Sequence, residues 1–311
     1  MDSVVGVIIV NYNTFEETVS CIDSIRQHTS SEYKIYLVDN GSKPEVYEKI
    51  HIEFGGSSDV CVIRSSENMG YSGGNNLGAN KAISDGCEYL VIANNDIEFR
   101  NDVIGILKND INEEVAISGP AITNLDNKDG QQLIKTYSLG AALIDRVPFI
   151  YINRLLGIYK IDARKLTKKT LFYGMVQGSC FIVRADVFKE IGLFDDNVFL
   201  YSEERILSIK LKNNGYKTCY NPAAKILHKE GQSTKKTGNA FADYHRYISD
   251  YYTVVRYCDG LKIVKRLIKQ MRLFSYRVKQ SRHIEYKEYL PILIDRMNKI
   301  EKGDYRIPYK Y

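Results

Sequence analysis

The strongest constraint on the fold is the alternation of short apolar runs with segments of helical periodicity over the first hundred residues. The run Val4–Val10 is rich in β-branched residues, which is typical of a strand buried on both faces of a sheet. A polar turn separates it from Phe15–His28, where apolar residues recur at helical spacing. The same rhythm predicts strands at Lys34–Val38, Val60–Arg64 and Tyr89–Ala93, a helix at Pro44–Ile50, and a loop that runs into a helix ending near Gly86. This alternation predicts an α/β fold with a mostly parallel sheet and right-handed crossovers.

Clusters of polar residues follow the predicted strands at their carboxyl ends. These clusters are Asn11–Asn13, Asp39–Ser42, Asn68–Asn76 and Asn94–Asp96. Ligands of open α/β sheets bind beyond the carboxyl ends of the strands, where the loops converge on one crevice. The sequence therefore predicts a binding site at this edge of the sheet.

Two adjacent carboxylates, Glu203 and Glu204, stand at the start of a predicted amphipathic helix. The helix dipole favours acidic residues at this position whatever their chemistry, so a helix-starting acid pair is one interpretation. The apolar run Phe199–Tyr201 just before them favours a second one. It would place the pair at the edge of a partly buried pocket, where a raised pKa suits a general base. We predict that this pair supplies a general base.

Asp96 ends the triplet Asn94-Asn95-Asp96, which follows a buried-looking strand. A carboxylate in this place can ligate a hard cation such as Mg²⁺ or Mn²⁺, which in turn neutralises a diphosphate leaving group. Asp96 could equally cap the turn into a following helix, because such turns are common. The spacing alone leaves both interpretations open.

A lone histidine, His228, ends a short strand predicted after the Glu203–Glu204 helix. Such a histidine is more often an ordinary hydrogen-bonding residue than a ligand. It gains significance only in company with the two acidic segments. Two acidic segments and one histidine on an α/β chain are suited to a site in which a metal ion binds a diphosphate and a general base lies beside it. The sequence therefore predicts an enzyme that transfers a group from an activated phosphate donor.

A glycine-rich loop follows the strand Val60–Arg64. Its sequence, NMGYSGGNNLG, matches neither of the phosphate-binding patterns GxGxxG and GxxxxGK[ST]. We interpret it as a segment that binds a nucleotide-sugar. Its backbone would approach the ligand closely at Gly70, and the side-chain amides of Asn68, Asn75 and Asn76 would contact it. The loop after the first strand, NYNTFEE, lacks the glycines of a dinucleotide-binding fingerprint, which argues against an oxidoreductase.

The formal charge of +5 is unevenly distributed. Residues 251–311 carry 15 Lys and Arg against 6 Asp and Glu, a net charge of +9, so residues 1–250 carry −4. A basic C-terminal segment indicates an anionic partner, which we expect to be a membrane surface rather than nucleic acid. No signal peptide or apolar run of about 20 residues is evident, and six scattered cysteines look like small core residues. We therefore expect a cytoplasmic protein that contacts the inner face of the membrane peripherally.

Within the basic segment, apolar and cationic residues alternate at near-helical spacing. The apolar positions are Tyr257, Leu261, Val264, Leu267, Ile268 and Met271, and the cations between them are Lys262, Lys265, Arg266, Lys269 and Arg272. This pattern predicts a helix that packs on the body of the protein with a solvated basic face, or one that faces a membrane. The two interpretations are compatible.

Seven motifs in order resemble the family-2 inverting glycosyltransferases, and more particularly bacterial rhamnosyltransferases of surface-polysaccharide assembly. The motifs are VIIVNYNT, VDNGS, ENMGYSGGNNLG, NND, GSCFIVRADVFKEIGLFDDNVFLYSEE, LKNNGYK and HKEGQS, between about Val5 and Ser233. The resemblance implies a GT-A type fold. It also implies direct displacement with inversion, which moves a sugar from a donor such as dTDP-rhamnose or UDP-hexose. The acceptor would be a hydroxyl of a glycan or a lipid-linked oligosaccharide.

The resemblance also implies roles for individual residues. It places Asn11 and Asn13 beside the nucleotide, Asp39 against the base or ribose, and Asn95 among the residues that bind the nucleotide-sugar. Asp96 matches the metal-binding end of the Asp-x-Asp motif, Glu204 falls at the catalytic aspartate of a Glu-Asp pair, and His228 lies near the metal or diphosphate. Two positions depart from the family pattern. Glu204 is one methylene longer than the aspartate, and Ile206 stands where an acidic residue is usual. Glu203 as the base, or a non-catalytic nucleotide-sugar-binding subunit, therefore remains an alternative.

The domain organisation follows from these assignments. We predict a glycosyltransferase domain over residues 1–239, with a nucleotide-binding part at about 1–100 and an acceptor part at about 101–239. Within it, the irregular residues 124–172 are interpreted as an insertion near the acceptor side. A basic helical region follows over residues 240–311.

Overall fold

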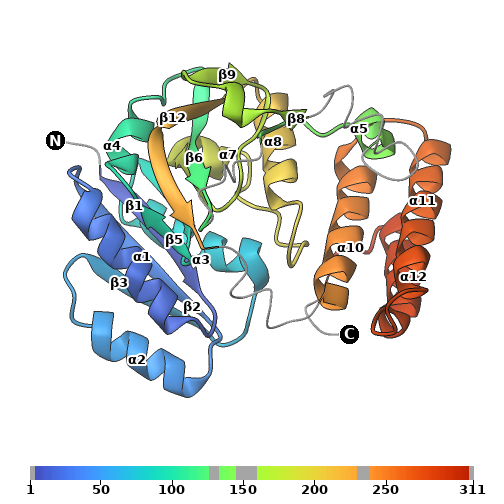
Figure 1. Cartoon of the computed structure of the whole chain (residues 1–311), viewed down its shortest axis with the longest axis horizontal. Coiled ribbons are helices and arrows are strands. Elements are labelled where there is room, and N and C mark those ends of the chain that lie inside the picture. Colours follow the sequence, from blue (N-terminus) through green and yellow to red (C-terminus); the bar gives the residue numbers. More distant parts are fainter. Residues whose placement is uncertain (1–3, 126–132, 145–159, 230–238, 308–311) are drawn as a thin grey trace.

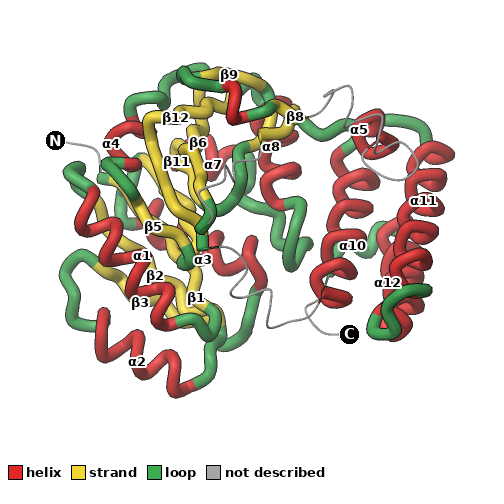
Figure 2. Tube along the Cα trace, viewed as in Figure 1, coloured by secondary structure: helices red, strands yellow, loops and turns green. Residues whose placement is uncertain are grey.

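A computed structural model of the chain describes residues 4–125, 133–144, 160–229 and 239–307. A central sheet with helices on both faces forms one part of the molecule, and three C-terminal helices lie beside it (Figure 1). The separation of helix and strand layers is plain in Figure 2. The predicted fold class, a mostly parallel α/β sheet with a helical C-terminal extension, is confirmed.

Within the described residues, the central sheet has nine strands in the order β3-β2-β1-β4-β11-β6-β12-β5, with β9 paired to β12. The strands are β1 (Val5–Asn11), β2 (Tyr33–Asn40), β3 (Val60–Ser65), β4 (Tyr89–Asn94), β5 (Ile97–Phe99), β6 (Val115–Thr123), β9 (Thr170–Phe172), β11 (Cys180–Arg184) and β12 (Lys217–His228). Strands β1 to β4 are parallel to one another, whereas β11 runs antiparallel to both β4 and β6. The carboxyl ends of β1, β2 and β4 therefore share one edge.

The helices cover both faces of this sheet and bury two apolar cores. They are α1 (Phe15–His28), α2 (Pro44–Phe54), α3 (Gly70–Ser84), α4 (Val103–Lys108), α7 (Ala185–Glu190) and α8 (Glu203–Asn213). Successive residues of β1 enter different cores, because Ile8 and Ile9 point to opposite faces of the strand. All six cysteines are free and five of them are buried, in line with their interpretation as core residues.

Helix α3 begins earlier than the sequence pattern predicts. Residues 70–76, assigned to a loop from their glycines and asparagines, form its first two turns. Glycine is costly inside a helix and hides the helical pattern, but here it allows close packing. A Cβ at Gly78 would lie 2.7 Å from a methyl carbon of Ile8, and one at Gly74 would lie 2.9 Å from Val10. The missing side chains thus let α3 press against β1.

A small second sheet lies next to α8. It contains β7 (Leu133–Lys135), β8 (Lys160–Ile161) and β10 (Gly174–Met175), and it is accompanied by α5 (Leu139–Ile144) and the 3-10 helix η1 (Ala163–Lys165). Much of the predicted insertion, residues 126–132 and 145–159, lies outside the described residues. The strand that ends at His228 is longer than predicted, with twelve residues and a break in register between Asn221 and Lys225.

The C-terminal region is a bundle of α10 (Asn239–Tyr257), α11 (Lys262–Gln280) and α12 (Tyr286–Glu301). Its core is rich in tyrosine, and Val198 and Ile206 from the α/β part pack into that core. No helix in the described part of the chain is long and apolar enough to cross a membrane. The predicted solvated basic face needs correction, because Lys269 and Arg272 point inward and are buried.

Candidate active site

A pocket of about 360 Å³ opens at the edge of the sheet where β1, β2 and β4 end. This volume lies within the range of small-molecule sites. Its lining includes Asp96 after β4, His228 at the end of β12, and Glu203 and Glu204 at the start of α8. The two acidic segments, more than a hundred residues apart in sequence, therefore face the same space.

Asp96 and His228 meet at the base of the pocket. Strands β5 and β12 pair antiparallel, which places His228 opposite Ile97, and the Lys229 amide donates to the Asp96 carbonyl at 2.9 Å. The Asp96 Oδ1 and His228 Nε2 atoms are 3.2 Å apart. Because a strand and not a helix follows Asp96, the alternative of a helix cap does not apply. Backbone pairing thus brings the carboxylate and the imidazole together.

The chemistry of this pair fits a divalent cation. Within the described residues, Asp96 Oδ1 is buried without a hydrogen-bond partner, despite its closeness to His228. Buried polar atoms without partners are rare and need an explanation. Oxygen and imidazole nitrogen are ligands that Mn²⁺ accepts, and Mg²⁺ prefers oxygen. Within the described part of the chain, no three His, Cys, Asp or Glu side chains are placed so that they could together hold a metal ion, so a cation at Asp96 and His228 would need further ligands.

The carboxylates of α8 are presented by a strained turn. Tyr201 and Ser202 both have positive φ angles, 69° and 71°, which are uncommon for residues with a side chain. Glu203 and Glu204 then form the first helical turn, as predicted. Strained backbone of this kind is found at functional sites, where the surroundings hold it in place.

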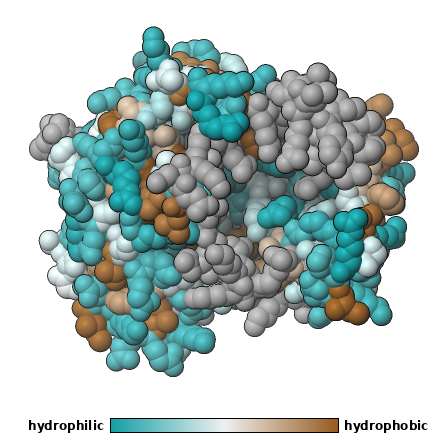
Figure 3. Space-filling view, viewed as in Figure 1, coloured by the Kyte–Doolittle hydropathy of each residue, from teal (hydrophilic) through white to brown (hydrophobic). Residues whose placement is uncertain are grey.

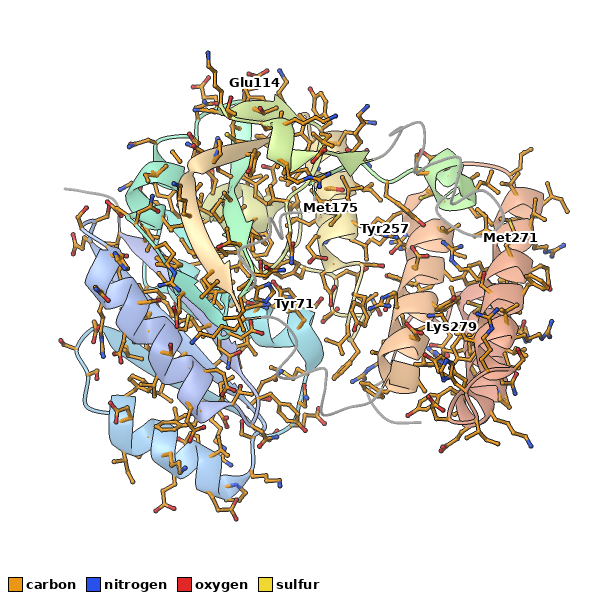
Figure 4. All side chains as sticks on the ribbon, viewed as in Figure 1. Tyr71, Glu114, Met175, Tyr257, Met271 and Lys279 are labelled. Carbon is orange, nitrogen blue, oxygen red and sulfur yellow. The ribbon has the colours of Figure 1, made fainter. Side chains whose placement is uncertain are left out.

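A short chain of hydrogen bonds holds Glu204. The Gly178 amide donates to Glu204 Oε1 at 3.0 Å, and the Tyr71 hydroxyl donates to the Gly178 carbonyl at 2.6 Å. A Cβ at residue 178 would lie 2.2 Å from Glu204 Oε1, so only glycine permits this approach. Tyr71, labelled in Figure 4, lies at the start of α3 in the middle of the molecule. Tyr71 lies in the predicted cluster Asn68–Asn76 and Gly178 in a family-like motif, but neither was singled out as a site residue.

Burial and mutual repulsion perturb the two carboxylates. Burial raises the pKa of Glu204, and the Gly178 amide partly opposes that effect. Burial and then the charge of Glu204 raise the pKa of Glu203 well above its usual range. Within the described residues Glu203 Oε1 has no hydrogen-bond partner. A carboxylate with a raised pKa is a stronger base than a solvated one, which suits proton abstraction.

The turn before α3 forms the next wall. Asn40 Nδ2 donates to Asn68 Oδ1 at 3.1 Å and to the Gly70 carbonyl at 3.0 Å, and the Gly70 amide also bonds Asn68. Gly70 has a φ of 74°, and a Cβ there would lie 2.3 Å from the Phe199 carbonyl. The Tyr71 amide donates to that carbonyl at 3.0 Å. The glycine-rich turn is thus tied to the segment that carries Glu203 and Glu204. Asn40 lies in the predicted polar cluster Asp39–Ser42, although it was not singled out as a site residue.

The other predicted amides differ in their placement. Asn75 lines the pocket, and within the described residues its Oδ1 is buried without a partner. Asn95 also lines the pocket, while its Nδ2 donates to the hydroxyls of Thr14 and Thr18. Asn76 is not among the lining residues, because its amide exchanges two hydrogen bonds with the backbone of Phe194. The structure gives Asn76 a role in packing.

The remaining predicted residues form a buried network beside the pocket. Asn11 Nδ2 donates to Asp39 Oδ1 at 3.2 Å and to the Ser42 hydroxyl at 3.0 Å. Asn13 has a φ of 58°, and its backbone N–H donates to the same Ser42 hydroxyl. Within the described residues Asp39 Oδ2 is buried without a hydrogen-bond partner, with Arg64 Nε 3.7 Å away. None of Asn11, Asn13 and Asp39 lines the pocket itself.

An aromatic wall closes the side of the pocket next to the C-terminal helices. Phe199 and Phe241 line the pocket, and His245 of α10 packs against both, with ring centroids 5.1 and 4.6 Å away. Burial lowers the pKa of His245 to about 3, so it remains neutral. The sequence carried no signal for this wall, because it forms only when α10 packs against α8.

Comparison with known proteins places the chain in a family. Residues 6–192, more than half of the chain, match the family described as Glycosyl transferase family 2. The chain belongs to this family. N-acetylglucosaminyl-diphospho-decaprenol L-rhamnosyltransferase of Mycobacterium tuberculosis is 23% identical over 263 residues, which cover 79% of this chain and 83% of the relative. The predicted resemblance to bacterial rhamnosyltransferases is confirmed.

Solved structures show the same fold. The mannosyltransferase PcManGT from Pyrobaculum calidifontis, in complex with GDP-Man and Mn²⁺, matches with a TM-score of 0.53 and 11% identity, over 98% of this chain and 87% of that one. GalNAc-T7 with UDP, GalNAc and Mn²⁺ matches with a TM-score of 0.59 and 17% identity, over 87% of this chain and 54% of that one. The chain thus spans about half the length of GalNAc-T7. Both of these glycosyltransferase structures contain a divalent metal.

The position that departs from the family pattern, Ile206, has a structural explanation in this family-2 glycosyltransferase. It is buried among the tyrosines of the C-terminal bundle, two residues after Glu204. A carboxylate in that environment would lose its hydration without a partner. The isoleucine therefore anchors the N-terminal end of α8 to the bundle. The HKEGQS motif continues into residues 230–233, which lie outside the described residues.

Proposed function

We propose that this glycosyltransferase moves a sugar from a nucleotide diphosphate donor to a hydroxyl of a growing, lipid-linked polysaccharide, with inversion at the anomeric carbon. The observation that carries the proposal is the placement of Asp96, His228, Glu203 and Glu204 around one pocket. The donor is a dTDP-rhamnose or a UDP-hexose. The name of the rhamnosyltransferase relative supports rhamnose as the sugar, and it specifies a diphospho-decaprenol-linked acceptor.

Glu204 is the proposed general base. It removes the proton from the acceptor hydroxyl while that oxygen attacks the anomeric carbon from the face opposite the diphosphate, so the configuration inverts. The Gly178 amide fixes its orientation, and burial raises its pKa. Glu203 is the alternative base, but its carboxyl is more deeply buried and its Oε1 has no hydrogen-bond partner within the described residues, whereas the Gly178 amide orients Glu204. These differences favour Glu204.

Asp96 and His228 are the proposed ligands of a divalent cation, Mg²⁺ or Mn²⁺, together with the donor diphosphate. Such a cation neutralises the negative charge that develops on the departing nucleoside diphosphate. Asp96 and His228 are held in register by the pairing of β5 and β12. They would therefore need little rearrangement when the donor binds, which favours catalysis by preorganisation.

The nucleotide is proposed to lie along the ends of β1 and β2. Asn68, Gly70, Asn75 and Asn95 line the pocket. Asp39 is buried beside the pocket without lining it, so its proposed contact with the base or ribose requires a local movement when the donor binds. Asn11 and Asn13 hold Asp39 and the following turn in place through Ser42.

We propose in addition that the enzyme works at the inner face of the cytoplasmic membrane, where a lipid-linked acceptor would be located.

A donor panel tests the proposal. The purified chain is incubated with dTDP-rhamnose, UDP-glucose, UDP-GlcNAc or GDP-mannose and a polyprenyl-diphosphate sugar of short chain length, with Mn²⁺, Mg²⁺ or EDTA. We expect transfer from a dTDP or UDP sugar that depends on metal, with an inverted linkage by NMR. Donor binding without transfer to any acceptor would favour a non-catalytic subunit. A retained linkage would contradict the role of Glu204.

A further inference from the structure

Helix α11 exposes an apolar stripe to solvent. Ile263, Leu267, Phe274 and Val278 are 67, 54, 58 and 38% exposed. Their spacing of four, seven and four residues places them on one face of the helix. We call these four residues the outer stripe. Leu261 and Ile284, which lie just beyond the two ends of the helix, are also exposed, at 70 and 84%.

This arrangement inverts the usual pattern of a surface helix. The inner face of α11 buries Ile268, Leu273 and Tyr276 against the bundle, so its apolar requirement is already met. Figure 3 shows hydrophobic residues at the upper end of the right-hand edge, where α11 begins, and Figure 4 marks this helix by Met271 and Lys279. A soluble helix normally turns polar residues outward. A run of exposed large apolar residues marks an interaction surface.

The charges of α11 identify the partner. The helix contains seven Lys or Arg residues and no Asp or Glu. Two of these cations point inward: Arg272 bonds Asp250, and Lys269 bonds Glu301. Three others, Lys262, Arg266 and Arg277, are exposed beside the outer stripe. No carboxylate of the described residues forms an ion pair with these three. Cations without an ion pair to the described residues therefore flank the exposed apolar residues.

We propose that the outer stripe of α11 and its flanking cations dock on the surface of an anionic lipid bilayer. The apolar side chains would enter the boundary between headgroups and acyl chains, and the guanidinium and ammonium groups would contact lipid phosphates. The stripe extends over about 22 Å of helix, which matches a flat surface better than a small ligand. A second copy of this chain is a poorer partner, because two faces of the same charge repel each other. The inference rests on the proposed lipid-linked acceptor and specifies the face that reaches it.

Vesicle binding of the full chain tests this surface. We expect the protein to sediment with phosphatidylglycerol-containing vesicles, more weakly with pure phosphatidylcholine, and less in high salt. The double substitution Leu267→Asp with Phe274→Asp should weaken binding about tenfold or more, because two large apolar side chains no longer leave water. Its matched control is Ile52→Asp with Leu171→Asp, which alters exposed apolar residues elsewhere and should leave binding unchanged.

The charged part is tested separately. Arg266→Glu with Arg277→Glu should reduce binding to anionic vesicles more strongly than to neutral ones, whereas Lys189→Glu on α7 should have a smaller effect. Circular dichroism checks that each variant folds. Wild-type protein that fails to bind anionic vesicles, or stripe variants that bind as well as wild type, would overturn the proposal. So would a dimer in light scattering that the stripe variants dissociate.

Transfer to a short-chain, water-soluble acceptor separates this inference from the proposed function. The stripe variants should retain that transfer, because α10 lies between α8 and the helix α11 that carries the stripe (Figure 1). Vesicle binding without any transfer would leave the surface standing and contradict the proposed function. Transfer to the short-chain acceptor without vesicle binding would support the proposed function and contradict the docking surface.

Discussion

Two buried carboxylates, Asp96 at the edge of the sheet and Asp250 in the helical bundle, solve the problem of a buried charge in different ways. Asp250 Oδ1 accepts from Tyr137 and Arg205, and Oδ2 accepts two bonds from Arg272. Asp96 Oδ1 faces His228 without a hydrogen bond from the described residues. In the bundle, protein donors satisfy the Asp250 carboxylate. At the sheet edge, Asp96 Oδ1 keeps an acceptor position for a ligand.

The difference extends to the surroundings of the two carboxylates. Several polar atoms on the pocket wall are buried without partners among the described residues. They are Asn75 Oδ1, Ser179 Oγ, Glu203 Oε1 and His228 Nδ1. Unsatisfied polar atoms lower stability, so their concentration here indicates a site built for a polar ligand. The Asp250 cluster, by contrast, holds the start of α8 through Arg205, the residue next to Glu204.

The largest expected effect is at the pocket. Glu204→Gln should reduce transfer on the order of 10²–10⁴-fold, because the amide cannot accept the acceptor proton. Donor binding by calorimetry should change little. The control is Glu190→Gln, an exposed glutamate on α7. Transfer close to wild type in a folded Glu204→Gln variant would move the base to Glu203 and weaken the contrast between the regions.

The bundle should respond in stability rather than in chemistry. Asp250→Asn leaves Arg272 buried with its charge unpaired, and we expect a loss of about 3–5 kcal/mol in the free energy of unfolding. Chemical denaturation measures it, with exposed Asp259→Asn as the control. A loss below 1 kcal/mol in the free energy of unfolding would show that the Asp250 cluster does not have the stabilising role that we contrast with the pocket.

Removal of the sheet-edge carboxylate should act through the metal. Asp96→Asn should weaken donor binding about tenfold or more in Mn²⁺ and leave the weaker binding in EDTA unchanged. The unfolding free energy should change little, because Asp96 Oδ1 has no hydrogen bond to lose within the described residues. Exposed Asp23→Asn is the matched control. An equal loss of affinity with and without metal would remove Asp96 from the proposed cation site.

The smallest effect concerns Glu203 and pH. Burial raises its pKa in the folded protein, so the folded state binds this proton more tightly than the unfolded chain does. Stability from this group is therefore present at low pH and is lost as pH rises through its raised pKa. Glu203→Gln should be more stable than wild type by about 1 kcal/mol at pH 8 and equal to it near pH 4. Thermal unfolding without ligand measures this. A difference that does not depend on pH would contradict the assignment.

Much of the framework was predictable because it depends on local pattern. Helix α1 was predicted with the bounds that the structure shows, and the strands β1 to β4 within about two residues. Where the prediction was wrong, tertiary contacts had overridden local preference. The start of α3 was hidden by glycines whose function is close packing on β1. The inward turn of Lys269 and Arg272 depended on Glu301 and Asp250, which lie on other helices.

By itself, the sequence determined the strand–helix order, the polar carboxyl ends of the strands and the family, because periodicity and motifs are local properties of the chain. Only the tertiary structure decided which polar groups share the pocket. Asn75 faces it while the neighbouring Asn76 binds Phe194, and Gly178 approaches Glu204 across 26 positions of sequence. The reason is physical: hydrogen bonds and burial depend on distances between segments, and a linear pattern does not contain those distances.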